Sequence, residues 1–395
     1  MARRGSQAPG TTVGTNFILL NTTVYSLNNA GQTAFRANLN GAAVSKWGIW
    51  AGGVGGLDLI ARSGNQAPGT PAGVDFSGFS NQPALNDAGQ MAFFGGLVGP
   101  GVNITNNEGI WSDVGGSLAL VARTGDPAPG TAVGVNFSRI DGRVVLNSAG
   151  QTAFWGRVVG PGVTGGNDGG IWSEGGGGGL ALVAREGEPA PGMPVGVNFA
   201  GFDSVVPVLN GEGQAAFKGW LTGAGVTASN NRGIWAEDAS GVLTLIAREG
   251  DVMDVDDGPG IDFRVIDTLS FLPASNFSGT QSGNEDGLPS AFNDKGQVAF
   301  HARFSGGTSG VFIANTIAVP GGSGDLDFDL DVDGFDFLKW QRGFGVEYDA
   351  SHLANWEAQY GSAAAAVAVA AVVPEPTTFA LTGLGLSFIA MRRRR

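Results

Sequence analysis

The chain of 395 residues contains 69 glycines, 18 prolines and no cysteine, and its formal net charge is −13 with only 14% charged residues. Without cysteine the chain forms no disulfide, zinc–thiolate site or thiol nucleophile. So few basic residues cannot neutralise a phosphate backbone, and nucleic acid is therefore not an expected partner. The length is sufficient for one large core and a small appendage.

Residues 1–318 carry one sequence pattern five times. An Ala-Arg pair opens each copy, at Arg3, Arg62, Arg123, Arg185 and Arg248. A polar residue and a phenylalanine come next, at Phe17, Phe76, Phe137, Phe199 and Phe263. A Gly-Gln pair follows, at Gln32, Gln90, Gln151, Gln214 and Gln297. A Gly-apolar-aromatic step closes each copy, at Trp50, Trp111, Trp172, Trp235 and Phe312. Such recurrence at one period of about 60 residues predicts a tandem array of one structural unit.

Inside a unit the hydrophobic period is two. Phe35, Ala37 and Leu39 alternate with polar residues, and Leu57 to Arg62 predicts a further strand. A unit of three or four strands cannot bury both faces alone, so five all-β sheets must stack. We favour a five-repeat β-propeller, because the Ala2-Arg3 strand could complete the last sheet and close the ring. A β-solenoid, or a longer propeller whose first repeats are absent from this chain, is the alternative.

The fifth unit departs from the pattern. In place of Ala-Pro-Gly it carries Asp251, Asp254, Asp256 and Asp257, and it holds an insert from Thr268 to Ser290 rich in Ser, Asn, Gly and Pro. We interpret the insert as a surface loop, either a binding loop or a tolerated insertion. Catalytic residues are usually not repeated in every unit. If the protein is an enzyme, this carboxylate cluster, which occurs in one repeat, is therefore the place to expect its catalytic residues.

An acidic segment follows the fifth unit. With Asp325 as position 1 of a loop, carboxylates fall at the spacing that a hard cation requires, ending at position 12 where a helix opens. This segment resembles the dockerin calcium loop, and the resemblance implies Ca²⁺ held by Asp325, Asp327, Asp329, Asp331, Asp333 and Asp336. A shifted frame with Gly334 at position 6 would leave Trp340 at position 12, where no carboxylate exists.

Dockerins pair two loop–helix units. Trp340 to Gly345 is echoed by Trp356 to Gly361, so the resemblance implies a small α-helical module over residues 319–361 and a cohesin-like partner. Two departures weaken the likeness: position 6 is Leu330 instead of glycine, and the second unit has no Asp-x-Asp loop.

The C-terminal segment indicates where the protein is sent. An Ala/Val linker, residues 362–373, leads to Pro374, Glu375 and Pro376, an apolar run, and the basic end Arg392, Arg393, Arg394 and Arg395. The apolar run from Phe379 to Met391 is short for a full membrane span, while basic residues after such a run stay cytoplasmic. Residues 374–395 resemble the PEP-CTERM sorting signal of bacterial surface proteins. The resemblance implies export, a C-terminal transmembrane sorting helix and processing by an exosortase-type membrane protease.

An exported protein also needs an N-terminal signal peptide with an apolar segment. Met1 to Gly10 has none, so we expect that the natural start lies upstream.

No catalytic residue set can be assembled from the sequence. His301 occupies a strand position that varies freely and is interpreted as a surface residue, and His352 as a solvated one. The recurring Arg and Gln side chains could bind anionic sugars or line a channel, but recurrence in every unit favours an architectural role.

The sequence therefore favours a non-enzymatic, exported surface or matrix protein that binds exopolysaccharide or partner proteins through propeller loops. A polysaccharide-acting glycosidase or lyase, and a structural spacer without ligand, are the alternatives.

Overall fold

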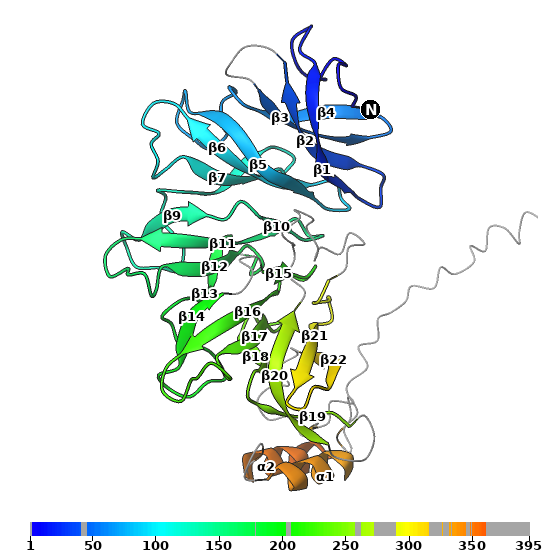
Figure 1. Ribbon diagram of the computed structural model, residues 1–395, viewed down its shortest axis with the longest axis vertical. Coiled ribbons are helices and arrows are strands. Elements are labelled where there is room, and N and C mark those ends of the chain that lie inside the picture. Colours follow the sequence, from blue (N-terminus) through cyan, green and yellow to red (C-terminus); the bar gives the residue numbers. More distant parts are fainter. Residues whose placement is uncertain are drawn as a thin grey trace, which may run out of the picture. The chain divides into compact units, whose positions relative to one another are not determined.

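The computed structural model divides the chain into two compact units, Met1–Ala318 and Val319–Arg395. It describes residues 2–40, 46–177, 179–202, 207–256, 262–271, 290–315, 326, 332, 334–344, 348 and 350–360. The first unit is all-β and built from antiparallel pairs, and the helices lie in the second unit (Figure 1).

Five sheets make up the first unit, and in each the strands follow one another in chain order. The first sheet holds β1 (Phe17–Leu27), β2 (Thr33–Leu39), β3 (Trp47–Gly53) and β4 (Gly56–Arg62). The second holds β5 (Asp75–Leu85), β6 (Met91–Val98), β7 (Glu108–Ser112) and β8 (Ala119–Arg123). The fifth holds β19 (Val252–Asp254), β20 (Phe263–Phe271), β21 (Gln297–Phe304) and β22 (Ser309–Asn315).

The third and fourth sheets have a divided first strand. In the third sheet β9 (Asn136–Ile140) and β10 (Val145–Leu146) both pair with β11 (Thr152–Val159), followed by β12 (Gly169–Ser173) and β13 (Ala181–Arg185). In the fourth, β14 (Asn198–Phe202) and β15 (Val208–Leu209) both pair with β16 (Ala215–Thr222), followed by β17 (Arg232–Glu237) and β18 (Leu243–Arg248).

The Gly-Ile-Trp step explains the core of each of the first four sheets. The tryptophan ring lies back over its own glycine, where a Cβ at Gly109 would meet Trp111 at 2.8 Å. In the second sheet Phe76 meets Trp111 edge-on with ring centroids 4.8 Å apart, and the indole N–H donates to the backbone carbonyl of Pro68 at 2.9 Å. Buried aromatic pairs of this geometry stabilise beyond their buried area. The step therefore anchors the Ala-Pro-Gly turn to its sheet.

A ladder of asparagines joins each sheet to the next. The Asn86 Nδ2 donates both to Gln90 Oε1 at 2.8 Å and to the backbone carbonyl of Asn147 at 2.9 Å. The same inter-sheet bond runs from Asn28, Asn147 and Asn210 to the carbonyls of Asn86, Asn210 and Asn293. Because these amides are buried, each would be costly to leave unpaired. The ladder thus connects all five sheets.

Apolar residues fill the junctions between sheets. The isoleucines of the Gly-Ile-Trp steps are buried and cluster with side chains of the following sheet, as Ile110 does with Ile140 and Leu146. We call this side of each sheet its outgoing face, and the opposite side, which receives the preceding sheet, its incoming face.

Two expectations are corrected in the fifth sheet. The N–H of Gly250 donates to the carbonyl of Ile266, as Gly64 does to Phe76, so Ile266 and not Phe263 is the counterpart of the recurring phenylalanines. Ile266 is accordingly buried and Phe263 exposed. Thr268 to Phe271 belong to β20 and not to a loop, while residues 272–289 of the insert lie outside the described residues.

The predicted closure of this sheet by Ala2-Arg3 is not found among the described residues. The sheet runs β19-β20-β21-β22, and residues 2 and 3 lie outside any strand.

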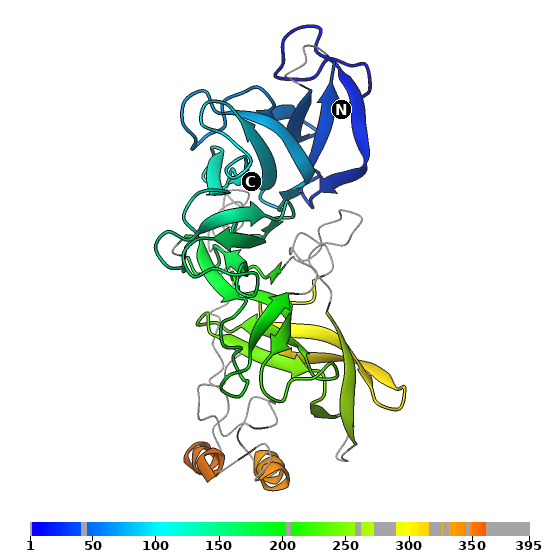
Figure 2. The ribbon, with the colours of Figure 1, turned by 60° about the vertical axis from the view of Figure 1, so that its left-hand side comes forward.

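The second unit contains α1 (Gly334–Gly343) and α2 (Ala350–Gln359), which lie side by side (Figure 2). Their contact is aromatic, with the rings of Phe337 and Trp356 4.9 Å apart. Among the described helices, none combines the length and apolarity that crossing a membrane requires. Residues 361–395, including the linker and the sorting signal, lie outside the described residues.

Candidate functional site

The recurring polar residues are used inside the fold. The Nε of Arg123, Arg185 and Arg248 donates to the backbone carbonyl of Asn106, Asn167 and Asn230, at 3.0, 2.8 and 2.9 Å. The Gln151 amide, at the rim of a hollow of about 360 Å³ between the second and third sheets, donates to the carbonyl of Gly175 at 3.2 Å. These bonds agree with the architectural interpretation of both residue types.

Residues whose charge and polarity differ from one unit to the next lie at one edge of the sheets. We call this the junction edge: the place where the second strand of a sheet ends and the third begins. Trp47, Glu108, Gly169 and Arg232 hold the same position there, each immediately before a Gly-Ile-Trp step. The position therefore changes from an aromatic to an acid, a glycine and a base while the fold stays the same.

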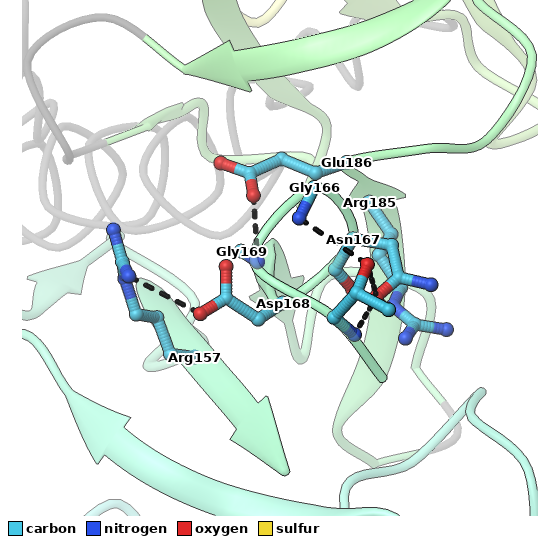
Figure 3. Close-up of polar contacts among 8 residues, drawn as sticks. Arg157, Gly166, Asn167, Asp168, Gly169, Arg185 and Glu186 are labelled. Carbon is cyan, nitrogen blue, oxygen red and sulfur yellow. Dashed lines mark hydrogen bonds and ion pairs between the residues drawn. The ribbon is translucent and has the colours of Figure 1, made fainter. Parts of the chain in front are cut away.

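In the third sheet this edge carries two carboxyl groups and two arginines (Figure 3). Arg157 forms an ion pair with Asp168 at 3.1 Å, and the N–H of Gly169 donates to Glu186 at 3.0 Å. The second oxygen of Asp168, Oδ1, is buried and has no hydrogen-bond partner among the described residues. The two carboxyl groups therefore lie close together, and one guanidinium, that of Arg157, is paired with Asp168.

Burial is the main cause that raises the pKa of Glu186, and the neighbouring Asp168 raises it further. The Gly169 N–H and Arg157 act in the opposite direction, because both favour the ionised form. This combination keeps a proton on Glu186 to higher pH than an ordinary glutamate would, while Arg157 holds the Asp168 carboxylate. Such a pair can donate a proton to a bound group.

Glycine at 169 is what admits Glu186. A Cβ at Gly169 would lie 2.5 Å from Glu186 Oε1. In the second sheet, where Glu108 replaces the glycine, the equivalent of Glu186 is Thr124, whose shorter hydroxyl accepts the same backbone N–H at 3.1 Å. The Gly169 and Glu186 pair is a local exchange that the repeat pattern does not reveal.

The other junction edges combine aromatic rings with charge. In the fourth sheet the Arg232 guanidinium lies 4.7 Å from the ring centre of Trp220, which is 38% exposed. In the first sheet Arg36 lies 4.8 Å from the ring of Trp47. In the second, burial raises the pKa of Glu108 and Arg139 of the next sheet opposes that shift.

The predicted calcium ligands fall mostly outside the described residues, since Asp325, Asp327, Asp329, Asp331 and Asp333 all do. Asp336 is buried in the first turn of α1 and accepts a hydrogen bond from the Leu326 N–H across the loop. The helix begins at Gly334, as a frame with Asp336 at position 12 requires. Among the described residues no group of three or more acids or histidines is placed to hold a metal ion. Calcium binding stays a prediction.

Two of the described fifth-unit acids, Asp254 and Asp251, make local contacts. Asp254 Oδ1 accepts the N–H groups of Asp256 and Asp262 and so closes its own turn, and Asp251 lies 3.8 Å from Arg248. Asp257 lies outside the described residues.

The interpretation of His301 as a surface residue is confirmed, since its side chain is exposed, whereas that of His352 as solvated is not. The position of His301 is nevertheless not a surface position in the other sheets, because its counterparts Phe94 and Trp155 are buried against the next sheet. His352 is half-buried in α2, with its ring centre 5.4 Å from that of Tyr348.

Three of the solved structures that match this chain are distantly similar to it. An α-L-arabinofuranosidase from Fusarium graminearum, solved with an iminosugar inhibitor, is 8% identical with a TM-score of 0.26 and covers 74% of this chain and 92% of its own. An α-L-arabinanase from Penicillium chrysogenum, complexed with arabinobiose, is 12% identical with a TM-score of 0.27, covering 75% and 78%. A protein of unknown function from Dyadobacter fermentans is 11% identical with a TM-score of 0.27, covering 77% and 98%. Likeness at this level carries no argument for function.

No curated protein matches the sequence. The PEP-CTERM protein-sorting motif matches residues 372–395, which implies an exported protein associated with the cell envelope and processed by exosortase, a membrane protease. The family described as a family of unknown function, DUF7453, matches residues 1–325, and the chain belongs to that family.

Proposed function

We propose that this protein is a non-enzymatic surface protein that binds acidic polysaccharide along the junction edges of its first unit. The observation that carries the proposal is the exposed Trp220 ring with the Arg232 guanidinium over one of its faces. An exposed aromatic face is apolar and flat, so it suits the C–H face of a sugar ring. A guanidinium offers paired N–H donors that match a carboxylate or sulfate.

Cations at neighbouring junction edges support a long ligand. Arg139 and Arg157 supply them in the third sheet, and the Trp47 ring lies at the edge of the first sheet, where the nearby Arg36 guanidinium is used to donate to the Phe79 carbonyl. The chain has a net charge of −13 and few basic residues, and several of these basic residues lie at the junction edge. A polymer with repeated negative charge could contact several edges at once, which multiplies weak contacts.

The test is binding of the full chain, in detergent, to an acidic polysaccharide such as alginate. Trp220→Ala and Arg232→Ala should each weaken binding about tenfold or more, a loss of roughly 1.4 kcal/mol. Lys295→Ala is the matched control, because it also removes a positive charge from an exposed position but lies in a turn away from the junction edge. Equal affinity in all four proteins would refute the site.

A second candidate function is polysaccharide cleavage at the third junction edge. The pairing of Glu186 with raised pKa and Asp168 held by Arg157 favours it, because glycosidases divide acid and base roles between two carboxyls. Sugar release that vanishes in Glu186→Gln and in Asp168→Asn, with binding retained, would make the protein an enzyme. Binding without any release keeps the non-enzymatic proposal.

A further inference from the structure

The outgoing face of the fifth sheet is built like a junction but is uncovered. Val311 holds the position of the Gly-Ile-Trp isoleucines, Ile49, Ile110, Ile171 and Ile234, which are at most 2% exposed. Val311 is 75% exposed. Two residues on, Ile313 is 70% exposed, whereas its counterparts Ser112, Ser173 and Ala236 are buried. Burying such side chains is worth about 1.5–3 kcal/mol each, so this apolar face is costly to leave in water.

The incoming face of the first sheet also exposes apolar side chains that are buried in the other sheets. Leu27 is 67% exposed, while the residues at its position in the other sheets, Leu85, Leu146, Leu209 and Phe292, are at most 2% exposed. Leu19, 51% exposed, holds the position of Gly78, where a Cβ would lie 3.6 Å from Trp47 of the preceding sheet.

The asparagine ladder ends at the same two faces. Among the described residues, the Asn293 amide donates within its own turn to Gln297 Oε1, and no next sheet offers it a carbonyl. At the other end, and within the described part of the chain, the carbonyl of Asn28 accepts the N–H of Gly31 alone, whereas the carbonyl of Asn86 accepts both the Gly89 N–H and the Asn28 amide. One end thus lacks an acceptor and the other lacks a donor.

The strand edges complement each other too. In the first four sheets the third strand pairs with an Ala-Arg strand, in the register of Gly48 with Arg62 and Ile49 with Ala61. In the fifth sheet β21 is the one described strand that pairs with β22, and Ala2-Arg3 lies outside any strand. An unpaired strand edge is a template for another chain.

We propose that the first sheet of a second copy seats on the outgoing face of the fifth sheet and repeats the junction that this chain already builds four times. Ala2-Arg3 of the incoming copy pairs with β22, Leu27 covers Val311, and the Asn293 amide reaches the Asn28 carbonyl. His301, which holds the position from which Arg36 and Lys218 donate to the carbonyls of Phe79 and Leu269, faces the incoming carbonyl of Leu20.

A second copy is the occupant because both halves of the junction are exposed in the same chain. The two faces differ from each other, so the contact is head-to-tail. A contact of this kind propagates into rings or filaments instead of stopping at a dimer. Such assembly suits a protein at a cell surface, and it does not depend on polysaccharide binding.

The test is sedimentation velocity of the full chain in detergent over a range of concentrations. We expect species larger than a dimer that dissociate on dilution. Val311→Asp and Leu27→Asp should each reduce the chain to monomers, whereas Val133→Asp, at a loop tip that is fully exposed, should leave assembly unchanged.

Mixing the two disabled variants gives the sharpest readout. Val311→Asp keeps an intact first sheet and Leu27→Asp keeps an intact fifth sheet, so an equimolar mixture should form dimers and nothing larger. A wild-type chain that is monomeric at every concentration would overturn the proposal. This holds even if the chain is monomeric because its own first sheet covers its own fifth sheet. Assembly that survives Val311→Asp, or a mixture that stays monomeric, would overturn it as well.

Discussion

The asparagine ladder makes a quantitative prediction about what holds the sheets together. Asn86→Ala removes two bonds within its own turn, from Nδ2 to Gln90 Oε1 and from the Gln90 N–H to Oδ1, and two to the next sheet, from Nδ2 to the carbonyls of Asn147 and Ser148. Asn293→Ala removes the same two bonds within its turn and a third from the Lys295 N–H, but no bond to a following sheet. The pair of variants therefore compares a turn that bonds to the next sheet with one that does not.

The expected difference follows from burial. Asn86 is fully buried, so its loss leaves the Asn147 carbonyl with the Gly150 N–H but without its inter-sheet donor, at a site shielded from water. The net contribution of one such hydrogen bond is about 0.5–1.5 kcal/mol. We expect Asn86→Ala to destabilise the protein by about that much more than Asn293→Ala does.

Urea unfolding, followed by tryptophan fluorescence, measures both variants, because a buried tryptophan lies in each of the first four sheets. Equal losses of unfolding free energy in the two variants would refute the reasoning, since the bond between sheets would then contribute nothing. A larger loss for Asn293→Ala would contradict the assignment of the ladder's end.

Further predictions concern pH, metal and the third junction edge. Burial raises the pKa of Glu237 to about 7 from its ordinary 4.5, so the folded state binds more protons than the unfolded state between those values, and stability should fall as the pH rises through that window. Glu237→Gln keeps an acceptor for the Ala215 N–H and should flatten this part of the stability curve; an unchanged curve would contradict the assignment. Calorimetric titration of the full chain with Ca²⁺ should give a binding heat that Asp325→Ala with Asp336→Ala removes, and identical isotherms would argue against the loop. Gly169→Ala should displace the Glu186 carboxyl and lower its pKa toward the ordinary value, as carboxyl NMR would report; an unmoved pKa would show that the exchange at 169 does not govern Glu186.

Much of the sheet architecture was predictable because alternation and turns are local. The strands at Thr33–Leu39 and Gly56–Arg62 follow from alternation, and the Gly-Ile-Trp step fixes the third strand. The prediction assigned the recurring phenylalanine of the fifth unit to Phe263 because of its residue type. The residue that is buried at the corresponding structural position is Ile266.

The site was harder to predict for a physical reason. A repeat pattern directs attention to residues that stay the same, and here those residues satisfy backbone groups inside the fold. Trp220, Arg232 and Glu186 occupy positions that vary, and no local signal separates a variable ligand position from a variable surface position. His301 shows the converse, since a varying position proved to face the next sheet in four units. The exchange of Glu108 and Thr124 for Gly169 and Glu186 gave no signal either, because the fourth unit carries Glu249 at the position of Glu186 beside Arg232 and not beside a glycine.

The most direct measurement of the proposed function is a binding isotherm of the full chain with alginate and with a neutral polysaccharide, with released reducing ends followed in the same samples. The proposal predicts saturable binding to the acidic polymer, weakened by salt, little binding to the neutral one, and no release of reducing ends. Binding to neither polymer, or release of reducing ends that depends on Glu186 and Asp168, would contradict it.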